Sequence, residues 1–324
     1  MDPATDVAAG ARVSAGPASS FPGISMSAAY QDLFVSASDG LKLYTRDYGS
    51  RLSEALPVVC LPGLARTSGD FHELALALSG DRQAPRRVLA LDYRGRGRSE
   101  WDKDWRRYDV RVELTDVLQV LTVAGIEEAV FVGTSRGGLI TMAIGAARPT
   151  LLRGAVLNDI GPVIDGKGLV RIRGYVGKLP EPRSFSEAGQ VLKQISDAQF
   201  PTFADADWEK MARGTWREAE GRLVLAYDPS LMKTLESIDL EAPLPVLWPL
   251  FEGLKGVPVL ALRGANSDLL AAATLDEMRR RHPRLDAITV PDQGHAPILD
   301  GDLIERIRAF VRMVEGGDGS PGRS

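Results

Sequence analysis

The sequence has little cysteine, histidine or aromatic content: one Cys, three His and 6% aromatic residues in 324. Because Cys60 is alone, no disulfide can form within the chain and no cluster of thiolates can hold a metal. Long apolar runs are also missing, since residues 246–251 fall far short of the roughly 20 residues that cross a bilayer. These absences argue against a disulfide scaffold and a membrane-spanning protein, and we expect a cytoplasmic one.

Neither sign of charge dominates the chain. It contains 39 basic and 43 acidic residues, for a net charge of −4, and no long run of either sign. Nothing in this balance draws the protein to nucleic acid or to an anionic membrane surface. The 44% hydrophobic content is enough for a large core and excludes disorder of the whole chain. We therefore expect a small molecule as the partner, with a homo-oligomer left open.

The two ends of the chain differ in composition from the rest. Residues 1–29 are rich in Ala, Gly, Ser and Pro and lack the basic start and apolar core of a secretory signal. We expect them to form a disordered tail, with Met26 as a candidate native start. Residues 316–324 are expected to form a flexible C-terminal tail.

Between the tails, short strand-like runs alternate with helical patterns, which is typical of an α/β protein with a mostly parallel sheet. The turn signal Asp39-Gly40 between residues 33–37 and 41–48 predicts an opening antiparallel pair. Nearly continuous apolar runs predict parallel strands covered on both faces. These runs are 58–61, 88–91, 129–132, 155–157, 257–262 and 287–290.

The strand–helix rhythm breaks after residue 162. Residues 163–249 are rich in Trp, Pro and charge, and we expect them to form a helical cap inserted between two parts of one core, 30–162 and 250–315. Apolar residues at helical spacing in 110–121 and 303–314 predict two helices that cover the core sheet.

The most informative motif is G-x-S-x-G at residues 133–137, between a strand-like run and a helical pattern. In this context the motif is typical of a sharp strand-to-helix turn that exposes its serine. Gly133 and Gly137 fit because a Cβ at either position would crowd neighbouring backbone. The motif predicts Ser135 as a nucleophile.

A serine hydroxyl needs a base within hydrogen-bond reach, and only three histidines are available. His72 lies in a helix-like segment, where an exposed or packing role is the default. His282 lies at a helix end that we expect to be solvated. His295 follows the last predicted strand, in a loop at the sheet edge where such folds place their sites. We predict His295 as the base.

An acid must orient the imidazole and stabilise its charged form. Asp268 comes soon after the strand predicted at 257–262 and follows the order nucleophile, acid, histidine. Asp159, after the strand predicted at 155–157, is the alternative, with bonding of loop backbone as its expected role. We predict Asp268 as the acid and keep Asp159 as its rival.

Two backbone N–H groups are expected to stabilise a negative oxygen that develops during acyl transfer. One is that of Arg136, directly after the serine. The other is that of Leu64, in the loop after the strand predicted at 58–61, where Gly63 allows close approach of the backbone.

The segment 92–99, Asp-Tyr-Arg-Gly-Arg-Gly-Arg-Ser, has the glycines and arginines of a phosphate-binding loop. It does not complete G-x-G-x-x-G, and no Gly-Lys-Ser/Thr follows. We expect a structural loop above the sheet, with Arg94 or Arg98 paired to carboxylates.

Together these segments resemble the α/β-hydrolase superfamily from about residue 30 to residue 314. Residues 61–64, Leu-Pro-Gly-Leu, look like its oxyanion loop, and 92–99 looks like its D-x-R-G-x-G-x-S loop. The 133–137 motif looks like its nucleophile elbow, Asp268 its acid position, and Gly294-His295 its histidine loop. The resemblance implies an eight-stranded, mostly parallel sheet with helices on both faces and an inserted helical cap. It also implies Ser-Asp-His hydrolysis without cofactor or metal.

The sequence departs from the family pattern at Pro62, where many members carry a histidine that often braces the oxyanion loop. A serine rather than an aspartate at position 135 argues against the haloalkane dehalogenase and epoxide hydrolase branches. We expect a serine hydrolase that cleaves a small or medium carboxylic ester or lactone through an acyl-enzyme intermediate.

Two alternatives stay open. The first is a C–C hydrolase of meta-cleavage-type dienones, in which Arg66 or Arg173 holds a substrate carboxylate. The second is a noncatalytic ligand-binding member of the fold, because fold does not fix function.

Overall fold

The computed structural model describes residues 29–317. The predicted tails, 1–29 and 316–324, therefore lie almost wholly outside the described residues, as does Met26.

An eight-stranded sheet forms the centre of the molecule, in the order β1-β2-β4-β3-β5-β6-β9-β10. In that order the strands are Gln31–Ser36, Lys42–Tyr48, Val88–Asp92, Val58–Leu61, Ala129–Thr134, Leu152–Asn158, Val259–Gly264 and Leu285–Val290. Strand β2 is antiparallel to both β1 and β4, and every other neighbouring pair is parallel. The opening hairpin and the six later strands expected from the sequence are confirmed.

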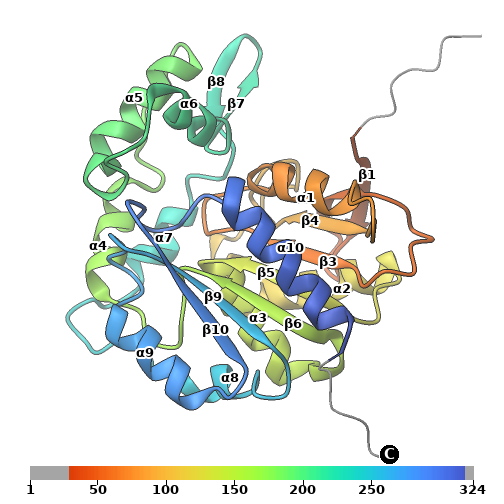
Figure 1. Ribbon diagram of the computed structural model, residues 1–324. Coiled ribbons are helices and arrows are strands. Elements are labelled where there is room, and N and C mark those ends of the chain that lie inside the picture. The colour runs from red at the N-terminus through yellow and green to blue at the C-terminus, as the bar shows by residue number, and fades with distance from the viewer. Residues whose placement is uncertain (1–28, 318–324) are drawn as a thin grey trace, which may run out of the picture.

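Helices cover both faces of this sheet (Figure 1). Because successive strand side chains point to opposite faces, Val58 and Cys60 pack on one face while Val59 and Leu61 pack on the other. The first face is covered by α1 (His72–Ser79) and α10 (Gly301–Glu315). The second is covered by α2 (Val110–Ala124), α3 (Arg136–Ala147) and α9 (Ala272–Arg281).

The long helix α2 illustrates why these segments are helical. The side chain of Asp109 caps its N-terminus by accepting a hydrogen bond from the amide of Arg111, and Gly125 ends it in the left-handed conformation, with φ 70°. Between these caps, Val117, Val120 and Leu121 are buried against the sheet. The two sheet-covering helices predicted at 110–121 and 303–314 are confirmed as parts of α2 and α10.

The segment between β6 and β9 contains short helices joined by long loops. Its helices are α4 (Gly166–Tyr175), α5 (Phe185–Ser196), α6 (Asp205–Arg213), α7 (Leu231–Glu236) and α8 (Trp248–Glu252). It also contains an antiparallel hairpin, β7 (Trp216–Ala219) and β8 (Arg222–Leu225), which the sequence analysis did not predict.

Part of this segment has a hydrophobic cluster of its own. Side chains of α5, α6, β7 and β8 pack around Trp208 and Trp216, apart from the two clusters on the sheet faces. Figure 1 shows these four elements standing beyond one end of the strands. Residues 163–249 are called the insertion below.

None of the helices in residues 29–317 is long and apolar enough to span a bilayer. Cys60 is a free thiol buried in β3.

Candidate active site

Ser135 lies at a sharp turn between β5 and α3, with φ 51° and ψ −112°. The tight packing of the turn requires glycine at both flanking positions of the motif. A Cβ on Gly133 would lie 2.5 Å from the carbonyl carbon of Gly137, and a Cβ on Gly137 would overlap the carbonyl oxygen of Leu61. The strand-to-helix turn predicted from G-x-S-x-G is therefore the geometry observed.

The side chain of His295 reaches this serine from the loop after β10. Its Nε2 lies 2.9 Å from Ser135 Oγ, and its Nδ1 lies 2.8 Å from Oδ2 of Asp159. The imidazole is 7% exposed, and the amide of His295 donates to Oε1 of Gln199, in the insertion. The structure thus brings together the two residues predicted as nucleophile and base, although they are 160 positions apart.

Asp159 follows β6 directly and is fully buried, with φ 55°. Its Oδ1 accepts a hydrogen bond from the amide of Gly264 (2.8 Å), and its Oδ2 accepts one from the hydroxyl of Ser267 (2.5 Å). These neutral donors fix the carboxylate while leaving its charge free to face His295. In this arrangement the imidazole Nδ1–H donates to Asp159, so Nε2 can accept the serine proton.

The placement predicted for Asp268 is wrong: its carboxylate does not contact His295. The two carboxylate oxygens instead accept hydrogen bonds from Nε (2.7 Å) and Nη2 (2.9 Å) of Arg171, on α4 of the insertion. Burial raises the pKa of Asp268, but the hydrogen bonds and charge of Arg171 outweigh burial and hold that pKa below its usual range. Asp159, the rival, takes the place beside the histidine.

The other two histidines lie away from Ser135. His72 borders a cavity that Ser135 also borders, but its Nδ1 lies 3.0 Å from the hydroxyl of Tyr48. His282 was expected at a solvated helix end, but it is 2% exposed, with Nε2 2.9 Å from the carbonyl oxygen of Leu254. Burial lowers the pKa of His282. Within residues 29–317, no group of three or more His, Cys, Asp or Glu side chains could hold a metal.

The two predicted amide donors lie at the serine. Leu64 and Ser135 border one cavity, and a Cβ on Gly63 would lie 3.9 Å from Cβ of Ser135. Arg136 is the first residue of α3, so its N–H has no acceptor within the helix. The N-terminal end of a helix also carries a partial positive charge, which favours a negative oxygen there.

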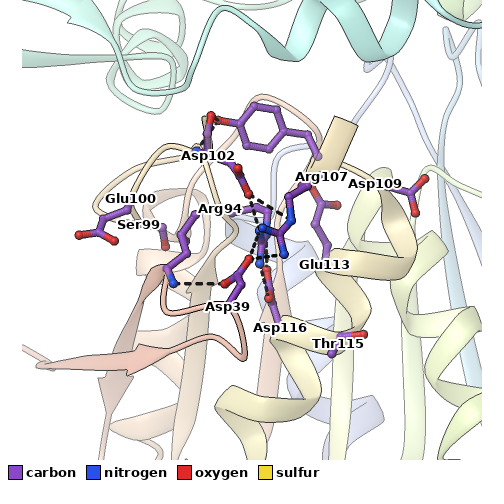
Figure 2. Close-up of polar contacts among 12 residues, drawn as sticks. Asp39, Arg94, Ser99, Glu100, Asp102, Arg107, Asp109, Glu113, Thr115 and Asp116 are labelled. Atoms are coloured by element: carbon purple, nitrogen blue, oxygen red, sulfur yellow. Dashed lines mark hydrogen bonds and ion pairs between the residues drawn. The ribbon is translucent and has the colours of Figure 1, made fainter. Parts of the chain in front are cut away.

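The loop 92–99 has the structural role expected of it. Arg94 is buried and pairs with three carboxylates, those of Asp39, Asp102 and Asp116 (Figure 2). Arg98 pairs with Asp32 at 2.6 Å. Both arginines are held by carboxylates, as predicted from the sequence.

Comparison with known proteins decides the family. The model of the alpha/beta hydrolase family matches residues 58–307 of this chain. The chain belongs to the α/β-hydrolase family.

Characterised relatives of this hydrolase are hydrolases too. The chain is 36% identical over 247 residues to a 3-hydroxybutyrate-oligomer hydrolase of Cupriavidus necator, which covers 74% of this chain and 82% of that protein. It is 27% identical over 262 residues to the sn-1-specific diacylglycerol lipase ABHD11 of Mus musculus, covering 78% and 80%.

A solved structure of an alpha/beta hydrolase from Novosphingobium aromaticivorans is 38% identical to this hydrolase. It superposes with a TM-score of 0.80 over 88% of this chain and 99% of that one. The fold and the general class of reaction, hydrolysis, are thereby established for this chain.

In this hydrolase Ser135 borders a cavity of about 460 Å³, which lies between the edge of the sheet and the insertion. Ser135, Leu64 and His295 border it from the core, and Tyr175 and Met211 border it from the insertion. The insertion therefore roofs the space beside Ser135.

Cationic side chains outnumber carboxylates in the cavity wall: Arg46, Arg66, Arg171, Lys210 and Arg213 against Asp70 and Glu73. Three of these cations have carboxylate partners. Arg66 pairs with Asp70, Arg171 with Asp268, and Lys210 with Asp300. Arg66, suggested above for a substrate carboxylate, also donates to Thr215 and to the carbonyl oxygen of Met211, so each of its three guanidinium nitrogens already has a partner.

Arg46, on β2, differs from those three cations. Its guanidinium lies over the ring of Tyr30 (4.8 Å to the centroid) and beside Gly69, whose Cβ would come within 3.7 Å of Arg46 Nη2. Its Nε is buried without a hydrogen-bond partner. Over the range 29–317, Arg46 forms no ion pair with a carboxylate. The cavity wall thus contains a partly buried cation that has the hydroxyl of Tyr48 as a hydrogen-bonding neighbour but pairs with no carboxylate of the described residues.

Proposed function

We propose that this hydrolase cleaves carboxylic esters through an acyl-enzyme intermediate on Ser135. One observation carries the proposal: Ser135 Oγ, His295 and Asp159 form a continuous hydrogen-bonded chain, with distances of 2.9 and 2.8 Å, that opens into the cavity. Without an adjacent base, a serine hydroxyl is a poor nucleophile at neutral pH, so the contact with His295 is what makes Ser135 reactive.

The mechanism follows from these contacts. Nε2 of His295 takes the proton as Ser135 Oγ attacks the ester carbonyl, and the Asp159 carboxylate stabilises the imidazolium that forms. The amides of Leu64 and Arg136 donate to the developing oxyanion. His295 then gives its proton to the leaving alkoxide. A water molecule, deprotonated by the same histidine, releases the acid and restores Ser135.

We propose further that the substrate is an ester with a free carboxylate, of the type of a short hydroxyacid oligomer. The similarity to a 3-hydroxybutyrate-oligomer hydrolase supports this class, since each such oligomer combines ester bonds with one terminal carboxylate. The guanidinium of Arg46, which borders the cavity and pairs with no carboxylate of residues 29–317, supports it independently, because arginine binds carboxylates through two parallel N–H donors. Arg46 is the residue we assign to that carboxylate.

The test compares one charged and one neutral substrate. Purified enzyme is assayed with the linear dimer of 3-hydroxybutyrate and with the methyl ester of that dimer, using wild type, Ser135→Ala and Arg46→Gln. We expect Ser135→Ala to be inactive on both. Because a charge-assisted hydrogen bond contributes about 1.5–3 kcal/mol, we expect Arg46→Gln to raise KM about 10-fold or more for the free acid only.

Arg213→Gln is the matched control, since Arg213 borders the same cavity but is exposed and lies over the ring of Phe185. It should leave both KM values within about twofold of wild type. Full turnover by Ser135→Ala would overturn the ester mechanism. An equal rise in KM for the acid and for its methyl ester in Arg46→Gln would overturn only the assignment of Arg46.

A further inference from the structure

One buried carboxylate connects the loop of Leu64 with the start of α3, the two segments beside Ser135. Glu113, on α2, is 0% exposed; its Oε1 accepts a hydrogen bond from Nη1 of Arg96 (2.7 Å), and its Oε2 accepts one from Nε of Arg136 (2.6 Å). Arg96 is also 0% exposed and belongs to the loop after β4. The sequence analysis assigned no role to Glu113.

Arg96 contacts Leu64, one of the two residues whose amides are the predicted donors, and Arg136 is the other. Nε of Arg96 donates to the carbonyl oxygen of Leu64 at 2.7 Å, which fixes that residue from its carbonyl side. Arg136 is itself the second donor residue, and its Nη2 also donates to the carbonyl oxygen of Tyr108 (2.8 Å). A single carboxylate is therefore linked to Leu64 through the side chain of Arg96, and to the backbone of Arg136 through that residue's own side chain.

Opposite charges hold Glu113 and the two arginines together. Burial raises the pKa of Glu113, but the adjacent Arg136 and Arg96 guanidiniums outweigh burial and hold that pKa below its usual range. Glu113 is therefore ionised at neutral pH. Its loss would leave two buried guanidiniums facing each other without a counter-charge, which is strongly unfavourable in a low-dielectric interior.

We propose that Glu113 is a positioning residue for oxyanion stabilisation, holding the Leu64 loop through Arg96 and the start of α3 through Arg136. This inference rests on the proposed function. It also accounts for Pro62, at the position where many family members carry a bracing histidine: here the brace for the loop comes from Arg96, in the neighbouring loop. Glu113 touches no reacting atom and acts only through the two arginines.

Asp116, three residues along the same helix, offers a matched control. It is also buried and pairs with a buried arginine, because its two oxygens accept from Nε and Nη2 of Arg94, both at 2.7 Å. Figure 2 shows this cluster, in which Asp39 and Asp102 also bind Arg94. These bonds do not connect Asp116 to Leu64 or to Arg136. Loss of the Asp116 carboxylate should therefore lower the stability of the fold without changing how the oxyanion is stabilised.

The experiment compares Glu113→Gln with Asp116→Asn in the full chain. We measure kcat and KM for p-nitrophenyl butyrate, inhibition by a trifluoromethyl ketone, and the pH profile of kcat/KM. Removal of one oxyanion donor costs about 10²–10³-fold in kcat, so misplacement of donors in Glu113→Gln should cost about 10–10²-fold. KM should stay within about twofold, and the ketone, whose adduct carries the oxyanion, should bind more weakly by a factor similar to the loss in kcat.

The pH profile separates positioning of the oxyanion from damage to the base. We expect its midpoint to be unchanged in Glu113→Gln, because His295 and Asp159 keep their contacts. Asp116→Asn should have a lower Tm and wild-type kcat. Wild-type kcat and ketone affinity in Glu113→Gln, or an equal loss of kcat in both variants, would overturn the proposal.

If Glu113→Gln does not fold, Arg96→Lys is the second variant. Lysine keeps a positive charge near Glu113, but its single ammonium group cannot reproduce all three donations of Arg96, to Glu113, Arg94 and Leu64. The same loss of kcat and ketone affinity is expected, and wild-type values would refute the role. Failure of the proposed function is recognised separately, by turnover in Ser135→Ala.

Discussion

The loops after β6 and β9 carry two aspartates with different environments. Asp159 is fully buried, accepts from one amide and one hydroxyl, and has His295 as its only ion-pair partner within residues 29–317. Asp268 is a quarter exposed and is bound bidentately by Arg171 of the insertion. A carboxylate already neutralised by an arginine has little charge left for an imidazolium. The partner of each aspartate, and not its order in the chain, decides which can act as the acid.

The largest expected effect separates the two aspartates directly. Asp159→Asn should lower kcat about 10⁴-fold, because an amide can no longer hold His295 in the reactive tautomer or stabilise its charge. Asp268→Asn should keep kcat within about tenfold of wild type. Steady-state kinetics on p-nitrophenyl butyrate with both variants provide the measurement. The opposite ranking would restore Asp268 as the acid.

A smaller effect is expected at Ser267, which belongs to the loop of Asp268 but donates to Asp159. Removing its hydroxyl in Ser267→Ala deletes one hydrogen bond to the carboxylate and the acceptor for the amides of Leu269 and Leu270. One such bond contributes about 0.5–1.5 kcal/mol, so kcat should fall about 2–10-fold and Tm should also fall. An unchanged kcat would show that Asp159 does not need this donor.

The smallest effect concerns the ion pair of Asp268 and Arg171. The pKa of Asp268 is lower in the folded protein than in the unfolded chain, so the pair stabilises the fold at pH values above the unfolded pKa of about 3.9. That contribution is lost as the pH falls through the lower, folded pKa. We expect Asp268→Asn to reduce the free energy of unfolding by about 1 kcal/mol at pH 7, and the difference from wild type to shrink below pH 4.

Urea unfolding of both proteins at pH 7 and near pH 3 measures that difference. Arg279→Gln, which breaks a surface pair with Asp276, is a control expected to change stability less. A difference that grows as the pH falls would contradict the assigned direction of the pKa.

Much of the site was predictable because its signals are local. The glycines around Ser135 and the apolar runs of the parallel strands depend on near neighbours, and both were located correctly. The choice between Asp159 and Asp268 depends on contacts between residues that are far apart in the sequence. Strands β6 and β9 are adjacent and parallel, so both loops open at the same edge of the sheet. What separates the two aspartates is Arg171, a contact with Asp268 across 97 positions that no sequence pattern marks.

The hairpin β7–β8 was missed although the sequence contains a signal for it. Trp216–Ala219 and Arg222–Leu225 are joined by Glu220 and Gly221, with φ 51° and 74°. Positive φ at both central residues is typical of a two-residue hairpin turn, usually marked by Asn-Gly or Asp-Gly. The turn has the usual glycine at its second position, but glutamate at the first position is not part of the usual hairpin signal.

The most direct test of the account is the reaction of the protein with a fluorophosphonate, followed by peptide mass mapping. We expect one adduct, on the peptide that contains Ser135, and no adduct in Ser135→Ala. His295→Ala should react far more slowly, because the serine then lacks its base. An unlabelled wild-type protein, or an adduct on a different residue, would contradict the claim that Ser135 is the nucleophile.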